Sequence, residues 1–461
     1  MTASAPGQDP RPAPAGQSRR ALFAGSVGNF IEWYEFGVYG YFATVIAARF
    51  FTPEGGSEVE GLVRTYASFA LAFFFRPVGA ALFGRLGDRV GRRPVLILVI
   101  VLMTVATTLI GALPTYDTVG ALAPWLLTFL RVVQGLSAGG EFGGAVSVMT
   151  EFAPPGRRGL YGSWQSFTVA LGLLGGAGAA ALPASLLSPA ELESWGWRLP
   201  FLLALPLGSG ALWLRLRLDE TPAFRQQRER EGERGRPGAG AGDEAGAAAP
   251  AGGGAVVRPP GRETARAVAL GAGRVMGWAA AGYTFLVVLP SYLQSSLDAT
   301  FQQALLATVT ANLGFAATIL PAGRLSDRVG RRPVMLGGAL SVTVLALPLL
   351  DLLQDTGTSH AAKGIAVFAA GAVVGLMAGP GPAMLAEMFP TSVRYTGLGL
   401  AYALSNAVFS GCAGLIITET VKRTGSVDVP AYYAAAACAV SALALLAPHA
   451  SPDGRTPPES R

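Results

Sequence analysis

The stretch GRLGDRVGRRPV at residues 84–95 recurs almost unchanged as GRLSDRVGRRPV at residues 323–334. The copies start 239 residues apart and differ only where Gly87 is replaced by Ser326. Each contains the pattern Gly-x-x-x-Asp-Arg-x-Gly-Arg-Arg, in which arginines surround one acidic residue. A basic turn repeated with so little change predicts that the chain consists of two related halves.

Two further patterns repeat with nearly the same spacing. Glycines four residues apart lie at Gly135, Gly139 and Gly143 and, 236 residues later, at Gly371, Gly375 and Gly379. The pattern Glu-x-x-Pro-x-x-x-Arg begins at Glu151 and again at Glu387. Such glycines let membrane helices approach closely, and parallel duplication of six-helix halves is a known transporter plan.

The composition is typical of a membrane protein. The chain has 461 residues, of which 51% are hydrophobic and only 14% are charged, against roughly 25% charged residues in a soluble domain. Many apolar runs approach 20 residues, enough for a helix to cross about 30 Å of hydrocarbon. Twelve such segments are predicted at 21–48, 61–84, 95–113, 122–150, 161–187, 197–214, 267–292, 301–322, 334–352, 364–388, 395–420 and 430–447. We therefore expect an all-α integral membrane protein with twelve transmembrane helices in two six-helix bundles.

The polar stretches divide the chain into parts. Residues 215–266 are rich in Gly, Ala, Pro and mixed charge, a composition that cannot form a packed core, so a largely disordered cytoplasmic linker is predicted there. The expected division is a cytoplasmic tail at 1–20, a bundle at 21–214, this linker, a bundle at 267–447 and a tail at 448–461.

The basic residues predict an orientation. With a cytoplasmic N-terminus, the tails and even-numbered loops hold 26 Lys and Arg residues and the odd-numbered loops hold six. Because cytoplasmic loops carry an excess of these residues, both termini are expected in the cytoplasm. The protein is then expected to be multi-pass in the inner (plasma) membrane.

The repeated turns place charges of both signs on the cytoplasmic side. The candidate gating residues are Asp88, Arg89, Arg92, Glu151 and Arg158 in the first half and Asp327, Arg328, Arg331, Glu387 and Arg394 in the second. Carboxylates among arginines can form bidentate pairs, which would latch the halves while the other side opens. The alternative is that these arginines only obey the orientation rule, but that leaves the repeated Asp unexplained.

Ionisable residues inside predicted membrane segments are functional hypotheses by default, because each costs about 2.5–3.5 kcal/mol on insertion scales. The candidates for the proton-coupling site and substrate cavity are Asn29, Glu32, Glu35, Arg76, Arg131, Gln134, Glu141 and Arg274. Arg76 lies about 12 Å above the first turn, too deep to reach water easily, so a carboxylate partner is expected. Arg274, in the second half, could meet an anionic substrate group.

The repeat separates these charges from the scaffold. At the spacing of 236, Arg131 corresponds to Val367 and Glu141 to Met377, although the glycines between them are repeated. Scaffold residues should be duplicated, whereas a coupling site is needed once. Burial favours the neutral form of a carboxylate and a nearby arginine favours its charged form, so Glu32, Glu35 or Glu141 is expected to carry a proton.

Other classes of function have little support. Two cysteines in apolar runs and two histidines at segment edges give no disulfide framework or metal site, and no cofactor is expected. The GLSAG motif at 135–139 matches a hydrolase nucleophile elbow, but that elbow requires a strand–turn–helix and a histidine. The sequence shows no phosphate-binding loop, which argues against a primary pump. It also shows no attached signalling domain of the kind expected in a sensor.

The motifs resemble a known family. The repeated turn is similar to the signature loop of the major facilitator superfamily, and RVVQG at 131–135 is similar to its fourth-helix motif. More narrowly, five stretches of the chain resemble motifs of the metabolite–proton symporter family. They are GNFIEWYEFGVYGYFA at 28–43, FFRPVGAALFG at 74–84, GLSAGGEFGGA at 135–145, WGWRLPF at 195–201 and LDETPAF at 218–224. The likeness extends from residue 21 to about 447.

This resemblance implies a transporter rather than an enzyme, with a role for Arg131 in proton coupling. The family imports osmolytes such as proline and glycine betaine, or organic acids such as α-ketoglutarate, citrate and shikimate. We favour an osmolyte, for which Trp33, Tyr39 and Tyr41 could form a cage around an ammonium group unless they face lipid. An organic acid, or efflux by an antiporter of the same fold, remains the alternative. The expected partners are the substrate, a proton and the lipid bilayer, with no nucleic acid and a monomer as the functional unit.

Overall fold

A computed structural model describes residues 15–90, 92–139, 142, 146, 149–150, 153–216, 261–389 and 394–448. All regular secondary structure in these ranges is helical. The helices of the first half are α1 (Ala15–Tyr41), α2 (Ala43–Ile46), the π-helix η1 (Ala47–Phe51), α3 (Glu58–Val90), α4 (Arg92–Ala112), α5 (Tyr116–Val119), α6 (Leu122–Ala138), α8 (Arg158–Leu186), α9 (Pro189–Glu191), the π-helix η2 (Leu192–Gly196) and α10 (Arg198–Leu216).

The second half is likewise a series of long helices with short helical segments and two π-helices between them. Its helices are α12 (Gly261–Tyr283), the π-helix η3 (Thr284–Val288), α13 (Leu289–Leu297), α14 (Phe301–Val329), α15 (Arg331–Gln354), α16 (His360–Ala378), α17 (Gly381–Glu387), α18 (Arg394–Ser405), the π-helix η4 (Asn406–Gly411), α19 (Ala413–Thr424) and α20 (Val429–Leu446). Every one of the twelve predicted apolar segments is helical in its described part. Breaks of the α-helical pattern such as η3 and η4 occur frequently at functional sites.

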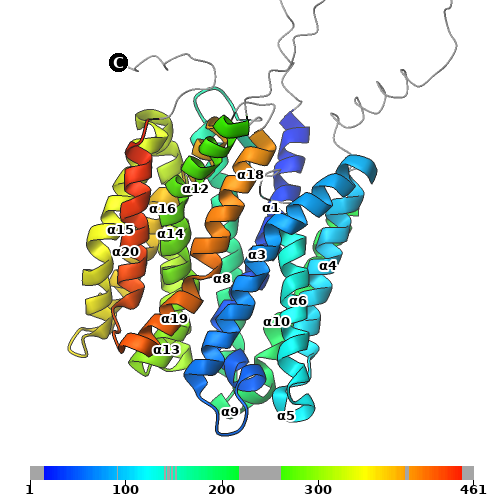
Figure 1. Ribbon diagram of the computed structural model, residues 1–461, viewed down its shortest axis with the longest axis vertical. Helices are drawn as coiled ribbons and strands as arrows, with labels where there is room; N and C mark the ends of the chain where they lie inside the picture. The colour runs from blue at the N-terminus through cyan, green and yellow to red at the C-terminus, as the bar shows by residue number, and fades with distance from the viewer. Residues whose placement is uncertain are drawn as a thin grey trace, which may run out of the picture.

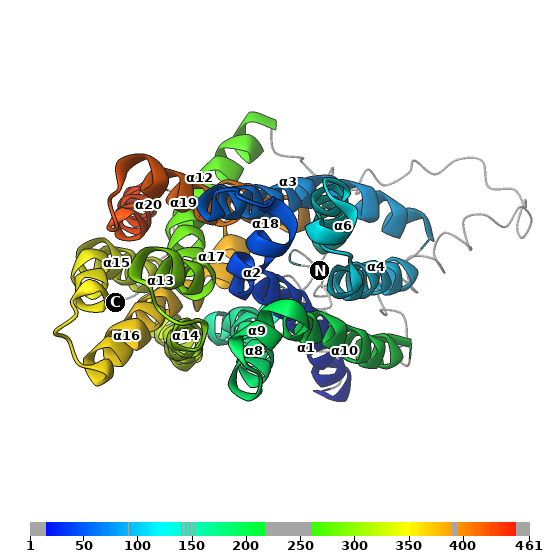
Figure 2. The ribbon, with the colours of Figure 1, turned by 90° about the horizontal axis from the view of Figure 1, so that it is seen from below.

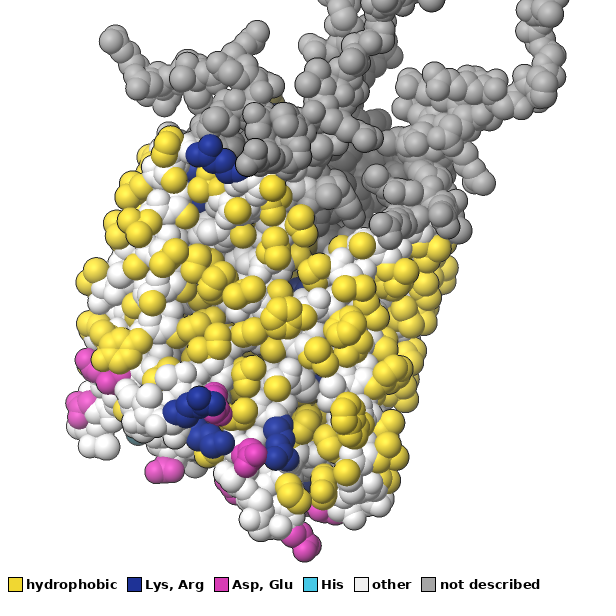
Figure 3. All heavy atoms as spheres, viewed as in Figure 1, with side chains coloured by type: hydrophobic (Ala, Val, Ile, Leu, Met, Phe, Trp, Pro, Cys, Tyr) yellow, Lys and Arg dark blue, Asp and Glu magenta, His cyan; other side chains and the backbone are white. Residues whose placement is uncertain are grey.

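The long helices run side by side in two groups. Figure 1 shows them nearly parallel to one axis, and Figure 2, from below, shows α12 to α20 beside the helices of the first half. Nine helices in the described ranges are long and apolar enough to cross a membrane, or ten if the bent pair at 189–214 counts as one span. Hydrophobic side chains cover the lateral face, and charged ones gather towards its lower edge (Figure 3). The predicted fold of two membrane-spanning helical bundles is confirmed.

The two halves are built around the same helix contact. A Cβ atom added at Gly135 on α6 would overlap the Ala72 carbonyl of α3, and one at Gly371 on α16 would overlap the Ala311 carbonyl of α14. Only glycine permits this approach. Because Ala72 and Ala311 differ by the spacing of the repeated turns, the contact supports the internal duplication read from the sequence.

Candidate functional site

Glu32 on α1 and Arg76 on α3 form a buried ion pair. Glu32 Oε1 lies 3.1 Å from Arg76 Nη2, and the side chains are 9% and 6% exposed. The central carbon of the Arg76 guanidinium lies 4.2 Å from the centre of the Phe73 ring and 4.4 Å from that of Phe36. A carboxylate and aromatic faces compensate a guanidinium for lost water. Glu32 is thus the carboxylate partner that the depth of Arg76 predicted.

Arg131 on α6 is connected to Glu35 by a chain of hydrogen bonds. Arg131 Nη1 donates to Gln134 Oε1 over 2.6 Å, and Gln134 Nε2 donates to Thr107 Oγ1 over 2.6 Å. The Thr107 hydroxyl lies 2.7 Å from Glu35 Oε2 and 3.0 Å from the Met103 carbonyl oxygen. Because a hydroxyl has one proton, Thr107 donates to only one of these acceptors at a time.

Aromatic rings also lie close to the Arg131 guanidinium. The central carbon of the Arg131 guanidinium lies 4.1 Å from the ring centre of Tyr39 and 4.8 Å from that of Phe69. Glu35 is fully buried, and its Oε1 has no hydrogen-bond partner among the described residues. The two acids of α1, three residues apart, therefore have different partners, since Glu32 contacts an arginine directly and Glu35 reaches one through two polar side chains.

A cavity lies between the two halves. It is lined by Trp33, Val169 and Leu173 from the first half and Trp278, Ala279, Gly282, Tyr283, Leu286, Val287, Phe315, Tyr402, Asn406 and Ser410 from the second. The polar residues Asn406 and Ser410 belong to the π-helix η4. We call this space the interface cavity.

Aromatic side chains form much of the wall of the interface cavity. The rings of Trp33 and Tyr283 lie 6.1 Å apart between centres, and those of Trp278 and Tyr402 lie 5.8 Å apart. The Arg76 guanidinium is 5.8 Å from the Trp33 ring centre, so the buried ion pair adjoins this wall. The buried Tyr283 hydroxyl has no hydrogen-bond partner among the described residues. Aromatic faces and an unused hydroxyl can receive a cation and an anion respectively.

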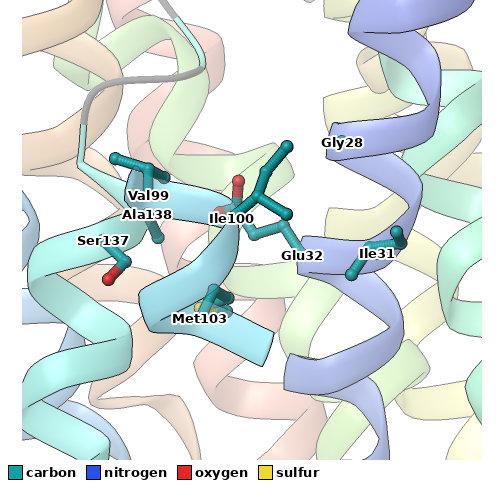
Figure 4. Close-up of a pocket in the computed structure, with 8 residues that line it drawn as sticks. All are labelled: Gly28, Ile31, Glu32, Val99, Ile100, Met103, Ser137 and Ala138. Carbon is teal, nitrogen blue, oxygen red and sulfur yellow. The ribbon is translucent and has the colours of Figure 1, made fainter. Parts of the chain in front are cut away.

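A second cavity lies inside the first half (Figure 4). Its lining comes from α1, α4 and α6 and consists of Gly28, Ile31, Glu32, Val99, Ile100, Met103, Ser137 and Ala138. We call it the N-half cavity. The Glu32 side chain lines this cavity, whereas the next residue, Trp33, lines the interface cavity.

The second repeated turn joins the halves at one end of the interface. Asp327 Oδ1 accepts from the Gly159 backbone N–H over 2.7 Å, and its Oδ2 accepts from that of Leu160 over 2.9 Å. Arg331 lies 2.7 Å from Asp327 Oδ1 and 3.2 Å from Glu387 Oε1. The first N–H groups of a helix lack intrahelical acceptors and attract anions, so Asp327 is an anion bound to the start of α8. We call this the signature-loop end.

Polar contacts also connect the halves at the opposite end. The hydroxyls of Tyr66 on α3 and Ser291 on α13 are 2.6 Å apart. Thr44 Oγ1 on α2 donates to Gln294 Oε1 on α13 over 3.1 Å. The halves thus touch at both ends of the interface cavity in this structure.

The other candidate residues have diverse surroundings. Asn29 is buried and donates to Thr168 Oγ1 over 2.6 Å. Arg274 donates to the carbonyl oxygens of Ala444 and Ala447 over 3.1 and 2.9 Å and lines neither cavity. Those carbonyl groups are at the C-terminal end of α20, where a cation is favourable. This placement therefore does not support a contact of Arg274 with substrate.

Of the remaining gating candidates, Arg158 and Arg328 are exposed. Outside the described residues lie Glu141, Glu151 and the side chains of Asp88, Arg89, Arg92 and Arg394. Tyr39 and Tyr41 are fully buried and line neither cavity. Of the three predicted cage residues, only Trp33 lines the interface cavity.

The sequence analysis missed residues that contact these groups. Thr107 connects Gln134 to Glu35, but one threonine in an apolar run gives no signal. Trp278, Tyr283 and Tyr402 were missed because an aromatic residue on a membrane helix is usually core or lipid-facing.

The fold and the site together define a membrane transporter with two pseudo-equivalent halves, in which a cluster of buried charges in the first half adjoins a cavity between the halves. Two family models match the chain, "Sugar (and other) transporter" at residues 21–240 and "Major Facilitator Superfamily" at residues 275–461. The proline/betaine transporter of Escherichia coli K12 is 34% identical over 424 residues, which are 91% of this chain and 81% of that protein. The ectoine/proline transporter ProP of Corynebacterium glutamicum is 35% identical over 437 residues, covering 94% and 84%.

The chain therefore belongs to the major facilitator superfamily and, within it, to the family of these osmolyte transporters. A solved structure of the proton:xylose symporter XylE has the same fold, with a TM-score of 0.72 at 18% identity and coverage of 94% of this chain and 95% of that one. The family expected from the sequence motifs is confirmed.

Proposed function

We propose that this protein imports a small zwitterionic osmolyte, such as glycine betaine or proline, together with a proton. The observation that carries the proposal is the buried Glu32–Arg76 pair beside the aromatic wall of the interface cavity. The names of the curated relatives support the substrate class. An inner-membrane location, cytoplasmic termini and a monomeric functional unit belong to the same proposal, as do the boundaries of the five parts of the chain.

The interface cavity suits a zwitterion. Trp33, Trp278, Tyr283 and Tyr402 offer ring faces on which a quaternary or secondary ammonium group is stabilised by cation–π attraction. Desolvated contacts of this kind contribute about 2 kcal/mol or more. The Tyr283 hydroxyl and the nearby Arg76 guanidinium would receive the substrate carboxylate.

Competition for Arg76 would couple the two fluxes. In the ion pair, Glu32 occupies the guanidinium. Protonation of Glu32 removes its charge and frees Arg76 to bind the substrate carboxylate. Loss of the proton restores the ion pair and displaces the substrate. A membrane potential of 100 mV supplies about 2.3 kcal/mol per charge, which supports about 50-fold accumulation for each proton carried.

Glu35, Arg131 and Gln134 have a supporting role in this proposal. Their hydrogen-bond chain ends at Thr107, which can donate either to Glu35 or to the Met103 carbonyl. This chain would hold α1, α4 and α6 in register around Glu32.

The Asp327 contact would act as a latch at the cytoplasmic side. It joins the second half to the start of α8 in the first half through charge-assisted hydrogen bonds. Separation of the halves at this end requires that these bonds break. Asp88 would act in the same way from the first repeated turn.

Transport by purified protein in vesicles tests the function. Labelled glycine betaine and proline should accumulate when the outside is acidic, and an uncoupler should abolish the accumulation. α-Ketoglutarate, citrate and shikimate, offered in the same assay, should accumulate little. Accumulation of an organic acid alone would contradict the proposed substrate class. Outward movement of substrate driven by protons that move inward would indicate efflux by antiport.

The variant Glu32→Gln tests the coupling step, because glutamine imitates the protonated acid. It should lose accumulation driven by the pH gradient and keep counterflow, the exchange of labelled for unlabelled substrate. The matched control is Glu35→Gln, which changes the same side chain one turn further along α1. Accumulation by Glu32→Gln equal to that of the parent would remove Glu32 as the proton carrier.

A further inference from the structure

Two neighbouring residues of α1 line different cavities. Glu32 borders the N-half cavity, whose described lining belongs entirely to the first half, and Trp33 borders the interface cavity, whose lining comes from both halves. Figure 4 shows Glu32 with Ile100 and Met103 of α4 and with Ser137 and Ala138 of α6 around one space. The proposed proton carrier thus contacts a space that the proposed substrate does not occupy.

The N-half cavity lies between Glu32 and the signature-loop end. Gly28 is one turn nearer than Glu32 to the start of α1, and Ser137 and Ala138 lie about one turn beyond Gln134 on α6. Val99 is in the second turn of α4, which starts at the first repeated turn. The three helices approach the same end of the molecule (Figure 1). The cavity is wide enough for a water molecule, and Glu32 and the Ser137 hydroxyl are polar groups on its wall.

The helices of the second half are in close contact at the equivalent place. The spacing of the repeated turns aligns Val99 of α4 with Gly338 of α15, and that of the glycine ladders aligns Ala138 with Val374. A Cβ added at Gly338 would lie 2.7 Å from Met377 Cγ, so α15 and α16 are in close contact there. Val374 is fully buried. A fold that can close this space in one half keeps it open in the half that contains Glu32.

We propose that the proton leaves Glu32 towards the signature-loop face through the N-half cavity, by a route separate from that of the substrate. The proposal rests on the function proposed above and adds the path. In the step itself, the O–H bond of the protonated Glu32 carboxyl breaks and a water molecule in the cavity accepts the proton. The carboxylate that remains pairs with Arg76. Proton release to this side then requires no separation of the halves at the Asp327 latch.

The test narrows the N-half cavity with side chains that the chain itself uses in the second half. In the double variant Ser137→Val/Ala138→Val, both residues become those found 236 positions later. A second variant, Ala138→Leu, adds more volume at one site. Both should slow uptake driven by a pH gradient about tenfold or more, which is part of the roughly 10²–10⁴-fold that a positioned proton-transfer group contributes. Counterflow should stay within about twofold of the parent, because it needs no proton release.

Two control variants separate the routes. Ala279→Leu adds the same bulk to the interface cavity and should reduce uptake and counterflow together. Ala81→Leu adds it on an exposed surface of α3 and should change neither. Retained counterflow in the narrowed variants also shows that they are folded and bind substrate, so a loss of uptake cannot be ascribed to misfolding.

The outcomes are distinguishable. Slow gradient-driven uptake with normal counterflow supports the separate route. Unchanged uptake in both narrowed variants, or a parallel loss of uptake and counterflow in both, overturns it while proton coupling of the parent stands. Uptake by the parent that ignores the pH gradient overturns the proposed symport itself.

Discussion

The two halves of the molecule share their packing but not their charges. Gly135 meets the Ala72 carbonyl in the first half as Gly371 meets the Ala311 carbonyl in the second. At the same spacings, Arg76 of the first half aligns with Phe315, and Arg131 aligns with Val367. Each buried cation of the first half therefore has an apolar counterpart in an equivalent helix.

This difference separates what the fold requires from what transport requires. Both halves must pack closely and move as units, so the glycine contacts are duplicated. A proton needs one carrier, and a second buried charge cluster would cost several kcal/mol per ion with no compensating use. The π-helices η3 and η4, with Asn406 and Ser410, instead give the second half irregular backbone beside the interface cavity.

The largest effect is expected where the halves are alike. Gly135→Leu and Gly371→Leu should each cause severe loss of folded protein, because the new side chain must displace a backbone carbonyl and overpacking typically costs about 1–3 kcal/mol or more. Thermal unfolding and the yield of monodisperse protein in detergent measure this. Gly178→Leu, which enters open space on α8, is the control. A severe effect in one half only would break the equivalence.

The next effect is expected where the halves differ. Arg131→Met should reduce transport by up to about two orders of magnitude, because it leaves the buried Gln134 oxygen without its donor, and an unsatisfied buried polar group costs about 1–3 kcal/mol. Val367→Met, at the aligned position of α16, should change transport only a few-fold. Initial uptake rates at equal amounts of folded protein provide the comparison. Equal losses in the two variants would mean that both positions serve packing alone.

An effect of similar or smaller size is expected at the latch. Asp327→Asn should change turnover about ten- to a hundredfold, since hydrogen bonds to a charged group contribute about 1.5–3 kcal/mol, and should leave substrate affinity nearly unchanged. Asp88→Asn should match it if the first repeated turn acts alike. Uptake rates and binding titrations measure the two quantities. A loss of affinity as large as the loss of turnover would argue against a gate.

The smallest effect is expected at the second acid of α1. Glu35→Gln retains an acceptor for the Thr107 hydroxyl, so transport should change by less than about tenfold, within the roughly 0.5–1.5 kcal/mol range of a single neutral hydrogen bond. Uptake driven by a pH gradient, measured for the Glu35→Gln and Glu32→Gln variants, tests this expectation. If Glu35→Gln abolishes accumulation and Glu32→Gln does not, the roles of the two acids are exchanged.

The sequence by itself determined the fold and indicated which charged residues are buried in the membrane segments. Twelve apolar segments, the repeated turns and the glycine ladders are local patterns, and each leads directly to helices that cross a membrane in two similar groups. The depth of Arg76 in its segment was enough to require a carboxylate, because no water is available there. The motifs from 28 to 224 were enough to identify the family.

Only the tertiary structure decided how these groups pair. Glu32 and Glu35 are nearly equivalent in the sequence, yet α3 brings Arg76 to the first and α4 brings Thr107 to the second. Asp327 was expected to pair with arginines, and it also binds the start of α8, which lies 167–168 residues away in the chain. The helices set these partners by their positions side by side, and such distances across a bundle are not encoded in any single segment. For the same reason, only the packed structure could show that Glu32 and Trp33, one residue apart, border two separate cavities.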